Sequence, residues 1–217
     1  NSFYATAGAI AAVGAKIVFV DCDDRYQIDI NDIKRKITKK TKAIIPVHWG
    51  GASPDMVKIM RIAKKNKLYV IEDACMGIGG KLGEKHPGTF GDIGAFSMHP
   101  LKSLNVMGDG GAIVTDNNKA YKWLKMYRNH GMINRDNINL WGVNCRMQPL
   151  QAIVALHGLK KLNNVIKIRE RNATYLDKKL LDLFPNVVIP KRPRGYKETH
   201  ALYMVRCKNR DELKKYL

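Results

Sequence analysis

Short apolar runs alternate along this chain of 217 residues with segments whose apolar residues recur at helical spacing. The runs are continuous rather than alternating and are rich in β-branched residues, which is typical of strands covered by helices on both faces. We predict strands at residues 17–21, 43–47, 68–72, 93–97 and 112–115. Because helical segments separate these strands, the pattern predicts an α/β fold with a mostly parallel sheet.

The segments between the predicted strands carry helix signals, and a first helix is expected at about residues 5–13. Ser53 is a suitable N-cap and Pro54 suits the first position of the helix that follows, while Pro149 opens another helix. The apolar stripes that we expect to face the core are Met56, Ile59, Met60 and Ala63 in one helix, and Ala120, Trp123, Leu124 and Tyr127 in another. These stripes indicate packing and not cofactor binding.

Helical periodicity continues from residue 163 to residue 184, which indicates a long helix of the kind that connects two domains. We therefore expect a large domain at residues 1–162, a connecting helix at 163–184, and the beginning of a small α+β domain at 185–217. Residues 187–189 and 201–206 are expected to form strands of this last domain. Both ends of the chain are abrupt, so we expect the protein to be longer at each end.

Composition and charge narrow the choice of partners. The chain is 45% hydrophobic and carries 38 basic against 19 acidic residues, a net charge of +19 that favours anionic partners. The basic residues are spread along the chain, without the interleaved aromatic residues of an RNA-stacking surface and without helix-turn-helix or zinc-finger spacing. Nucleic acid is therefore disfavoured, and it stays an alternative only because of the charge.

Cysteine spacing and hydropathy bear on metal sites and location. The cysteines, Cys22, Cys75, Cys145 and Cys207, lie far apart, so we expect no metal site and no redox motif. No apolar run reaches the length of a membrane span, and residues 1–4 lack the basic-then-apolar order of a signal peptide. We therefore expect a cytoplasmic location and no membrane partner.

Three short segments place polar residues or glycines after predicted strands, where open α/β sheets bind their ligands. They are residues 71–77 with the acidic pair Glu72 and Asp73, residues 91–104 with Lys102, and the glycine-rich residues 108–111. Each has a plain structural alternative, because acidic pairs cap helices, loop lysines face solvent and glycines form hairpin turns. Their joint occurrence at strand ends points to a binding site.

Longer stretches of the chain follow the pattern of one family in the same order. They are residues 1–10, Pro46-Val47-His48, Glu72-Asp73-Ala74, residues 88–92, the segment from Ser97 to Lys102, residues 108–112, Arg128-Asn129-His130-Gly131 and residues 142–147. On these motifs the chain resembles the DegT/DnrJ/EryC1/StrS sugar aminotransferases, which are fold-type I enzymes that use pyridoxal 5'-phosphate (PLP). The resemblance covers nearly the whole chain and implies an aspartate aminotransferase-like large domain that binds PLP.

The resemblance assigns the two central roles in catalysis. Lys102 matches the lysine that holds the PLP aldehyde as a Schiff base and moves a proton between substrate and cofactor. Asp73 matches the carboxylate beside the pyridine nitrogen, which keeps that nitrogen protonated. In the dehydratase branch of the family a histidine replaces this lysine, so Lys102 favours a transaminase.

The same resemblance names further cofactor contacts. Ser97 matches a phosphate ligand, and Phe3 matches the aromatic residue that covers one face of the ring. Met76 stands where many relatives carry a polar residue that contacts the ring hydroxyl, and a thioether cannot donate that hydrogen bond. Asn144 and Arg146 match a segment that reaches across a dimer interface to the partner's cofactor phosphate, which implies a homodimer with shared active sites.

Two further polar residues, His48 and Glu72, lie near predicted strand ends. For His48 a structural role is at least as well supported as a role in the site. Glu72 is expected to begin a helix or to support its surroundings rather than to act as a general base, because Lys102 already fills that role.

The resemblance implies a PLP-dependent transaminase that moves an amino group from glutamate or glutamine to a keto-sugar. We expect this sugar to be nucleotide-linked and the reaction to serve amino-sugar and polysaccharide biosynthesis. The alternative is a basic, non-catalytic binding or regulatory protein that keeps the fold, because a fold does not by itself determine function.

Overall fold

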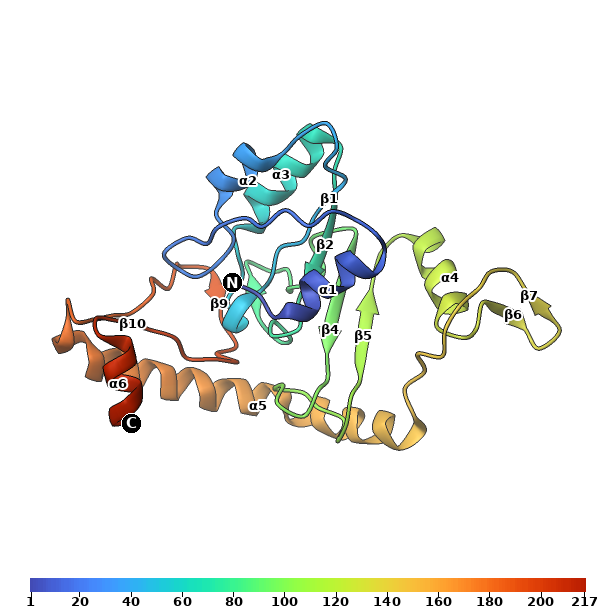
Figure 1. Ribbon diagram of the computed structural model, residues 1–217. Helices are drawn as coiled ribbons and strands as arrows, with labels where there is room; N and C mark the ends of the chain where they lie inside the picture. The colour runs from blue at the N-terminus through green and yellow to red at the C-terminus, as the bar shows by residue number, and fades with distance from the viewer.

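The computed structural model describes residues 1–217 and contains a central sheet flanked by helices (Figure 1). The sheet has the strand order β1 (Ala43–Ile44), β2 (Tyr69–Asp73), β4 (Ile93–Ser97) and β5 (Gly111–Val114). Strands β1, β2 and β4 are parallel, whereas β5 runs antiparallel to β4. The expected α/β fold with a mostly parallel sheet is therefore confirmed.

Helices and short strand pairs surround this sheet. The α-helices are α1 (Tyr4–Ala12), α2 (Ile30–Lys36), α3 (Met56–Asn66), α4 (Asn118–Tyr127), α5 (Pro149–Leu180) and α6 (Arg210–Tyr216), and the 3-10 helices are η1 (Trp49–Gly51) and η2 (Leu181–Leu183). The paired short strands are β3 (Lys81–Leu82) with β9 (Tyr196–Lys197), β6 (Met132–Asn134) with β7 (Asn137–Ile138), and β8 (Val187–Val188) with β10 (Arg206–Cys207).

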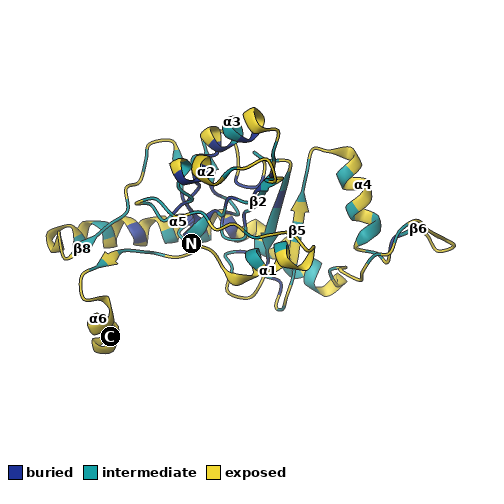
Figure 2. Cartoon of the chain, turned by 45° about the horizontal axis from the view of Figure 1, so that its top comes forward, coloured by how far each residue is buried: buried dark blue, intermediate teal, exposed yellow.

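Two buried apolar clusters hold the elements together. The first consists of Ile33, Ile44, Met56, Ile59, Ala63 and Val70, and it packs α2 and α3 against β1 and β2. The second consists of Met98, Leu104, Val106, Ala155, Leu162 and Ile166, and it packs the loop after β4 on α5 (Figure 2). The apolar stripe predicted for α3 therefore lies in the core. The stripe predicted for α4 does not, because none of the residues of that helix is buried.

The predicted strand at residues 17–21 is wrong. This segment has no regular secondary structure and pairs with no other strand, and the nearest β-bridge joins Cys22 to Ile28. Val18 and Phe19 are consequently exposed. An apolar run becomes a strand only where a neighbouring strand offers backbone partners, and no described strand lies beside this segment. The other strands predicted for the central sheet are confirmed: residues 93–97 form β4 with the expected ends, and β1, β2 and β5 have altered ends.

The predicted strand at residues 201–206 is also wrong, since only Arg206 belongs to a strand, the short β10. The backbone near its start instead bonds to partners far away in the sequence. The Leu202 amide donates to the Gly50 carbonyl at 3.1 Å. The Arg169 guanidinium donates to the His200 and Ala201 carbonyls at 3.0 and 3.1 Å. These contacts use the backbone groups that a strand would need.

Helix α3 begins later than the sequence signals indicated. Its N-cap is Asp55, whose side chain accepts from the Lys58 amide at 3.0 Å. The prediction that Ser53 caps this helix is therefore wrong. Ser53 is buried and its hydroxyl lies 3.1 Å from a ring nitrogen of His48, which leaves it unable to cap the helix. Pro149 does stand at the start of a helix, as predicted.

The helix that begins at Pro149 continues without interruption to Leu180, over 32 residues. The helix expected at Pro149 and the connecting helix expected at residues 163–184 are therefore one helix, followed by the 3-10 turn η2. The division of the chain into a large domain, a connecting helix and a small domain stays a prediction.

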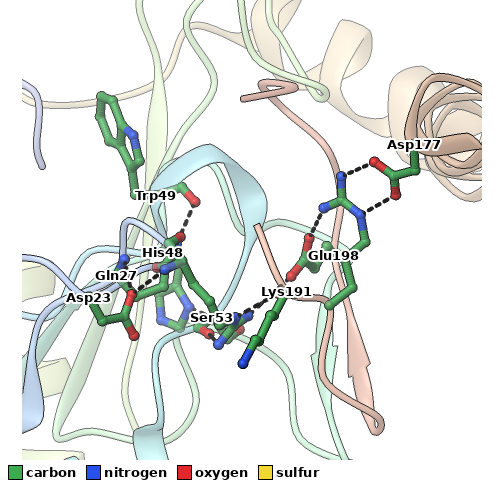
Figure 3. Close-up of polar contacts among 10 residues, drawn as sticks. Asp23, Gln27, His48, Trp49, Ser53, Asp177, Lys191 and Glu198 are labelled. Atoms are coloured by element: carbon green, nitrogen blue, oxygen red, sulfur yellow. Dashed lines mark hydrogen bonds and ion pairs between the residues drawn. The ribbon is translucent and has the colours of Figure 1, made fainter. Parts of the chain in front are cut away.

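A chain of ion pairs connects α5 with the C-terminal segment and with the region before α2 (Figure 3). Arg192 donates to both carboxylate oxygens of Asp177 in α5, at 2.6 and 2.9 Å, and to Glu198 at 2.8 Å. Glu198 also accepts from Arg25 at 3.1 Å. Burial raises the pKa of Asp177, but hydrogen bonds from Arg192 and Tyr203 outweigh it and hold this pKa below its usual value. The carboxylate therefore stays ionised at neutral pH.

We expect the substitution Arg192→Lys to lower the free energy of unfolding by about 2 kcal/mol, because an ammonium cannot replace the two-pronged contact with Asp177. The control is Arg206→Lys, whose partner Asp24 is 82% exposed, and we expect a loss of at most about 1 kcal/mol there. Urea unfolding of both variants provides the measurement. Equal losses would show that the network around Arg192 adds no more than a surface ion pair.

Candidate functional site

Asp73 is the last residue of β2 and lies at the carboxyl edge of the sheet. Its backbone amide donates to the Pro46 carbonyl and its carbonyl accepts from the His48 amide, both at 2.9 Å. Its side chain accepts from the Thr6 hydroxyl at 2.6 Å and from the Cys75 amide at 3.2 Å. The backbone and the carboxylate of Asp73 are therefore both held in place.

Ser97 and Lys102 lie at the end of the neighbouring strand β4. Asp73 is paired with Ala95 in the sheet register, so Ser97 follows just beyond this pair. Ser97 Oγ accepts from the His99 amide at 3.3 Å, and the Lys102 amide donates to the His99 carbonyl at 2.8 Å, which forms a turn. The side chain of Lys102 is half-buried and takes part in no ion pair.

Cys75 lies next to Asp73 and next to strand β4. Burial, together with the carboxylate of Asp73, raises the pKa of its thiol to about 12, against the opposing charge of Lys102. The thiol also lies 3.9 Å from the Ala95 carbonyl, next to β4. Cys75 therefore lies between the carboxylate of Asp73 and strand β4. Cys75 itself stays protonated at neutral pH and is no nucleophile.

Thr6 is a residue of this site that the sequence reasoning did not single out. Its hydroxyl donates to Asp73 and accepts from the Ser2 hydroxyl, both at 2.6 Å, so helix α1 is fastened to the end of β2. The available signal was a hydroxyl in an otherwise apolar helix. Phe3 is the N-cap of this helix, and its carbonyl accepts from the Thr6 amide at 3.1 Å. The Phe3 ring is 53% exposed and packs against the Tyr4 ring at 3.9 Å.

Met76 lies just beyond Asp73, in the turn that follows β2. Its carbonyl accepts from the Thr199 hydroxyl at 2.8 Å, which ties this turn to the C-terminal segment. The turn therefore depends on a contact that spans 123 residues of sequence. The thioether offers no hydrogen bond toward Asp73 or Lys102.

Asn144 and Arg146 lie apart from the group formed by Asp73, Ser97 and Lys102. Both are exposed and belong to the segment near α4 and the β6–β7 hairpin (Figure 1). The Arg146 guanidinium donates to the Asn129 side chain, and Asn144 forms a β-bridge with Asn129. Within one chain the structure therefore brings together only part of the expected set of cofactor contacts.

Comparison with known proteins identifies the family. A sequence model of the DegT/DnrJ/EryC1/StrS aminotransferase family matches residues 1–217. The chain belongs to this family. The resemblance found in the sequence motifs is therefore confirmed.

Individual members of the DegT/DnrJ/EryC1/StrS family are similar over most of the chain. The UDP-N-acetyl-3-dehydro-alpha-D-glucosamine 3-aminotransferase of Acidithiobacillus ferrooxidans is 38% identical over 98% of the chain and 58% of its own length. The 3-oxo-glucose-6-phosphate:glutamate aminotransferase of Bacillus subtilis is 40% identical over 75% of the chain and 37% of its own length. The crystal structure of S. venezuelae DesV, in complex with a ketimine intermediate, has a TM-score of 0.95 and 30% identity, over 99% of the chain and 58% of that protein.

The chain thus spans about three fifths of the length of relatives such as the A. ferrooxidans enzyme and DesV. The likeness to DesV confirms the expected PLP-dependent transferase fold for the residues described here. No helix of the structure combines the length and the apolar character needed to cross a membrane. No three His, Cys, Asp or Glu side chains gather into a possible metal site.

Proposed function

We propose that the protein is a PLP-dependent aminotransferase that transfers an amino group from glutamate or glutamine to a keto-sugar, which we expect to be nucleotide-linked. The observation that carries the proposal is the placement of Asp73 at the end of β2 and of the segment from Ser97 to Lys102 at the end of the adjacent strand β4. The carboxylate is held by hydrogen bonds, while the amine takes part in no ion pair.

The chemistry of these side chains fits PLP. The cofactor has an aldehyde, a basic ring nitrogen and a phosphate, and the site offers an amine, a carboxylate and a hydroxyl. The Ser103 hydroxyl, next to Lys102, is buried and without a partner, so this loop has a polar group to spare. When bound, PLP supplies an electron sink that stabilises negative charge on the substrate carbon.

The residues then have distinct roles. With PLP bound, Lys102 Nζ would hold the aldehyde carbon of the cofactor and would carry a proton to and from the substrate carbon. An Asp73 oxygen would keep the proton on the ring nitrogen, and the Ser97 hydroxyl would bind the phosphate. Phe3 would cover one face of the ring, and Met76 would stand near the ring hydroxyl without donating a hydrogen bond to it. Thr6 orients the Asp73 carboxylate.

The names of the relatives support the choice of substrates. The A. ferrooxidans enzyme is named for a UDP-linked 3-keto-sugar and the B. subtilis enzyme for glutamate as amino donor. The relatives described above are aminotransferases, so we do not propose the non-catalytic alternative. Amino-sugar and polysaccharide biosynthesis are the corresponding settings, and the cytoplasmic location stays a prediction.

We also propose a homodimer in which Asn144 and Arg146 contribute to the partner's site. Their exposure, away from Asp73 within their own chain, is what such a role requires. Trp141 and Leu150, on either side of them, are 94% and 77% exposed, an apolar surface that a second copy would cover.

The test of the proposed function is a half-reaction that needs no sugar. The purified protein is mixed with PLP and then with glutamate, and absorbance and 2-oxoglutarate are recorded. We expect a visible or near-ultraviolet band that disappears on addition of glutamate, with about one 2-oxoglutarate released per cofactor. Addition of the UDP-linked 3-keto-sugar, which takes up the amino group, should then restore the band. A protein that shows no band with PLP would contradict the proposal.

A further inference from the structure

A buried chain of polar side chains runs directly beside the candidate site. His48 Nε2 lies 2.8 Å from Glu72 Oε2, and His48 Nδ1 lies 3.1 Å from Ser53 Oγ. His48 and Glu72 are fully buried, and Ser53 is 3% exposed. With a neutral ring, the imidazole donates to Glu72 and accepts from the Ser53 hydroxyl, an arrangement that satisfies both nitrogens.

Glu72 is the central member of this chain. Its Oε2 accepts from the Gly88 amide at 2.8 Å, and its Oε1 accepts from the Phe90 and Gly91 amides, each at 2.6 Å. Together with His48, four donors therefore face one carboxylate, which uses its capacity to accept hydrogen bonds. Burial raises the pKa of Glu72, but hydrogen bonds from His48, Gly91 and Gly88 outweigh it and hold this pKa below its usual value. Glu72 is therefore a buried charge at neutral pH.

The order of serine, histidine and carboxylate is that of a hydrolytic triad, but burial excludes this reading. A nucleophilic serine must meet its substrate, whereas Ser53 is 3% exposed and His48 has no exposed surface. The chain lies inside the protein and holds parts of the backbone together. Its function is to be sought in the elements that it connects.

These elements are the ones that carry the candidate site. The His48 amide donates to the Asp73 carbonyl while the His48 side chain bonds to Glu72, so two successive residues of β2 are held by one histidine. Glu72 in turn holds the loop of Gly88 to Gly91 that leads into β4, the strand that ends in Ser97. No Cβ fits at Gly94, where it would lie 2.1 Å from the Gly88 carbonyl oxygen, so this loop and β4 are in close contact.

We propose that His48 and Glu72 are positioning residues for the cofactor site, because their contacts set the place of the Asp73 carboxylate relative to Ser97 and Lys102. The inference rests on the proposed function as a PLP enzyme. The inference adds two residues to the proposed function. These residues do not touch the cofactor, but they affect how tightly the cofactor binds. Residues that orient the ligands of a metal ion typically change its affinity by about tenfold or more, and we expect an effect of similar size for this pair.

The test compares His48→Ala with His48→Gln and with a control at the other end of β2. Alanine removes the donor to Glu72, whereas the amide of glutamine can still donate to it. The control Asp92→Asn removes a carboxylate that accepts from the Val70 amide at 2.8 Å, near the start of the same strand and away from Asp73. For each variant, the dissociation constant for PLP is measured by absorbance titration and the Tm by calorimetry.

We expect His48→Ala to raise the dissociation constant for PLP roughly tenfold, and His48→Gln to recover most of this loss. Asp92→Asn is expected to lower the Tm with a change in affinity of less than about twofold. An equal rise in the dissociation constant for His48→Ala and Asp92→Asn at equal loss of Tm would overturn the inference, since the pair would then act only on stability.

If His48→Ala does not fold, the variant Ser53→Ala is used in its place. This variant removes only the hydroxyl that contacts His48 Nδ1. A rise in the dissociation constant that exceeds that of Asp92→Asn at equal Tm supports the inference, and the same value as in Asp92→Asn overturns it. Wild-type protein that binds no PLP would instead contradict the proposed function itself, so the two failures are distinct.

Discussion

Replacing Lys102 with alanine is expected to abolish covalent attachment of PLP and to reduce transaminase turnover by roughly a thousandfold or more, while the fold is kept. The amine is the group that bonds the cofactor and moves the proton in the proposed function, and no other side chain of the site can do both. The fold survives because Lys102 lies in a loop, contributes to neither apolar cluster and takes part in no ion pair.

Borohydride reduction of the protein with PLP, followed by peptide mapping, locates the attachment point directly. The matched control is Lys119→Ala, which changes an exposed lysine of α4 and should keep full attachment. The Tm of both variants should equal that of the wild type within error. Reduced cofactor on a lysine other than Lys102, or turnover that survives its removal, would show that the role belongs elsewhere.

Replacing Asp73 with asparagine is expected to leave PLP bound and to slow turnover by roughly ten- to a hundredfold. An amide cannot form the charge-assisted hydrogen bond that keeps the ring nitrogen protonated, and such a bond is worth about 1.5–3 kcal/mol. The fold should tolerate the change, because the backbone contacts of Asp73 with Pro46 and His48 do not involve the side chain.

Thr6→Val is the matched companion of Asp73→Asn, because it removes the hydroxyl that donates to Asp73 at 2.6 Å and leaves the carboxylate in place. We expect a smaller loss in the same direction, about tenfold or less, since one hydrogen bond to a charged group is lost. The measurements are single-turnover rates with glutamate and the cofactor content of each variant. Normal rates in Asp73→Asn at full cofactor content would exclude its role at the ring nitrogen.

Much of the central sheet could be predicted from the sequence. The strand at residues 93–97 was predicted with the ends that β4 has in the structure, and the helix start at Pro149 is where α5 begins. Both signals are local, since a short, mostly apolar run and a proline at a first helical position depend on few neighbours. Asp73 and Lys102 were also placed correctly at strand ends, because parallel strands bring their carboxyl ends to one edge.

Other features depended on contacts that no local pattern contains. The segment at residues 17–21 has the composition of a strand but lacks a partner, and Ser53 has the side chain of a helix cap but bonds to His48. The Thr6 hydroxyl reaches a carboxylate 67 residues away in the sequence. In each case a hydrogen-bonding group had a choice of partners, and packing made the choice.

The sequence by itself therefore determined the family and the order of the main strands and helices, and the roles of Asp73 and Lys102 stay a prediction from its motifs. Only the tertiary structure decided that Glu72 is buried with four donors around it and that His48 holds both Glu72 and the backbone of Asp73. The physical reason is that periodicity and propensity act over a few residues along the chain. The cost of burying a charge, in contrast, is met only by donors that the fold gathers from distant segments.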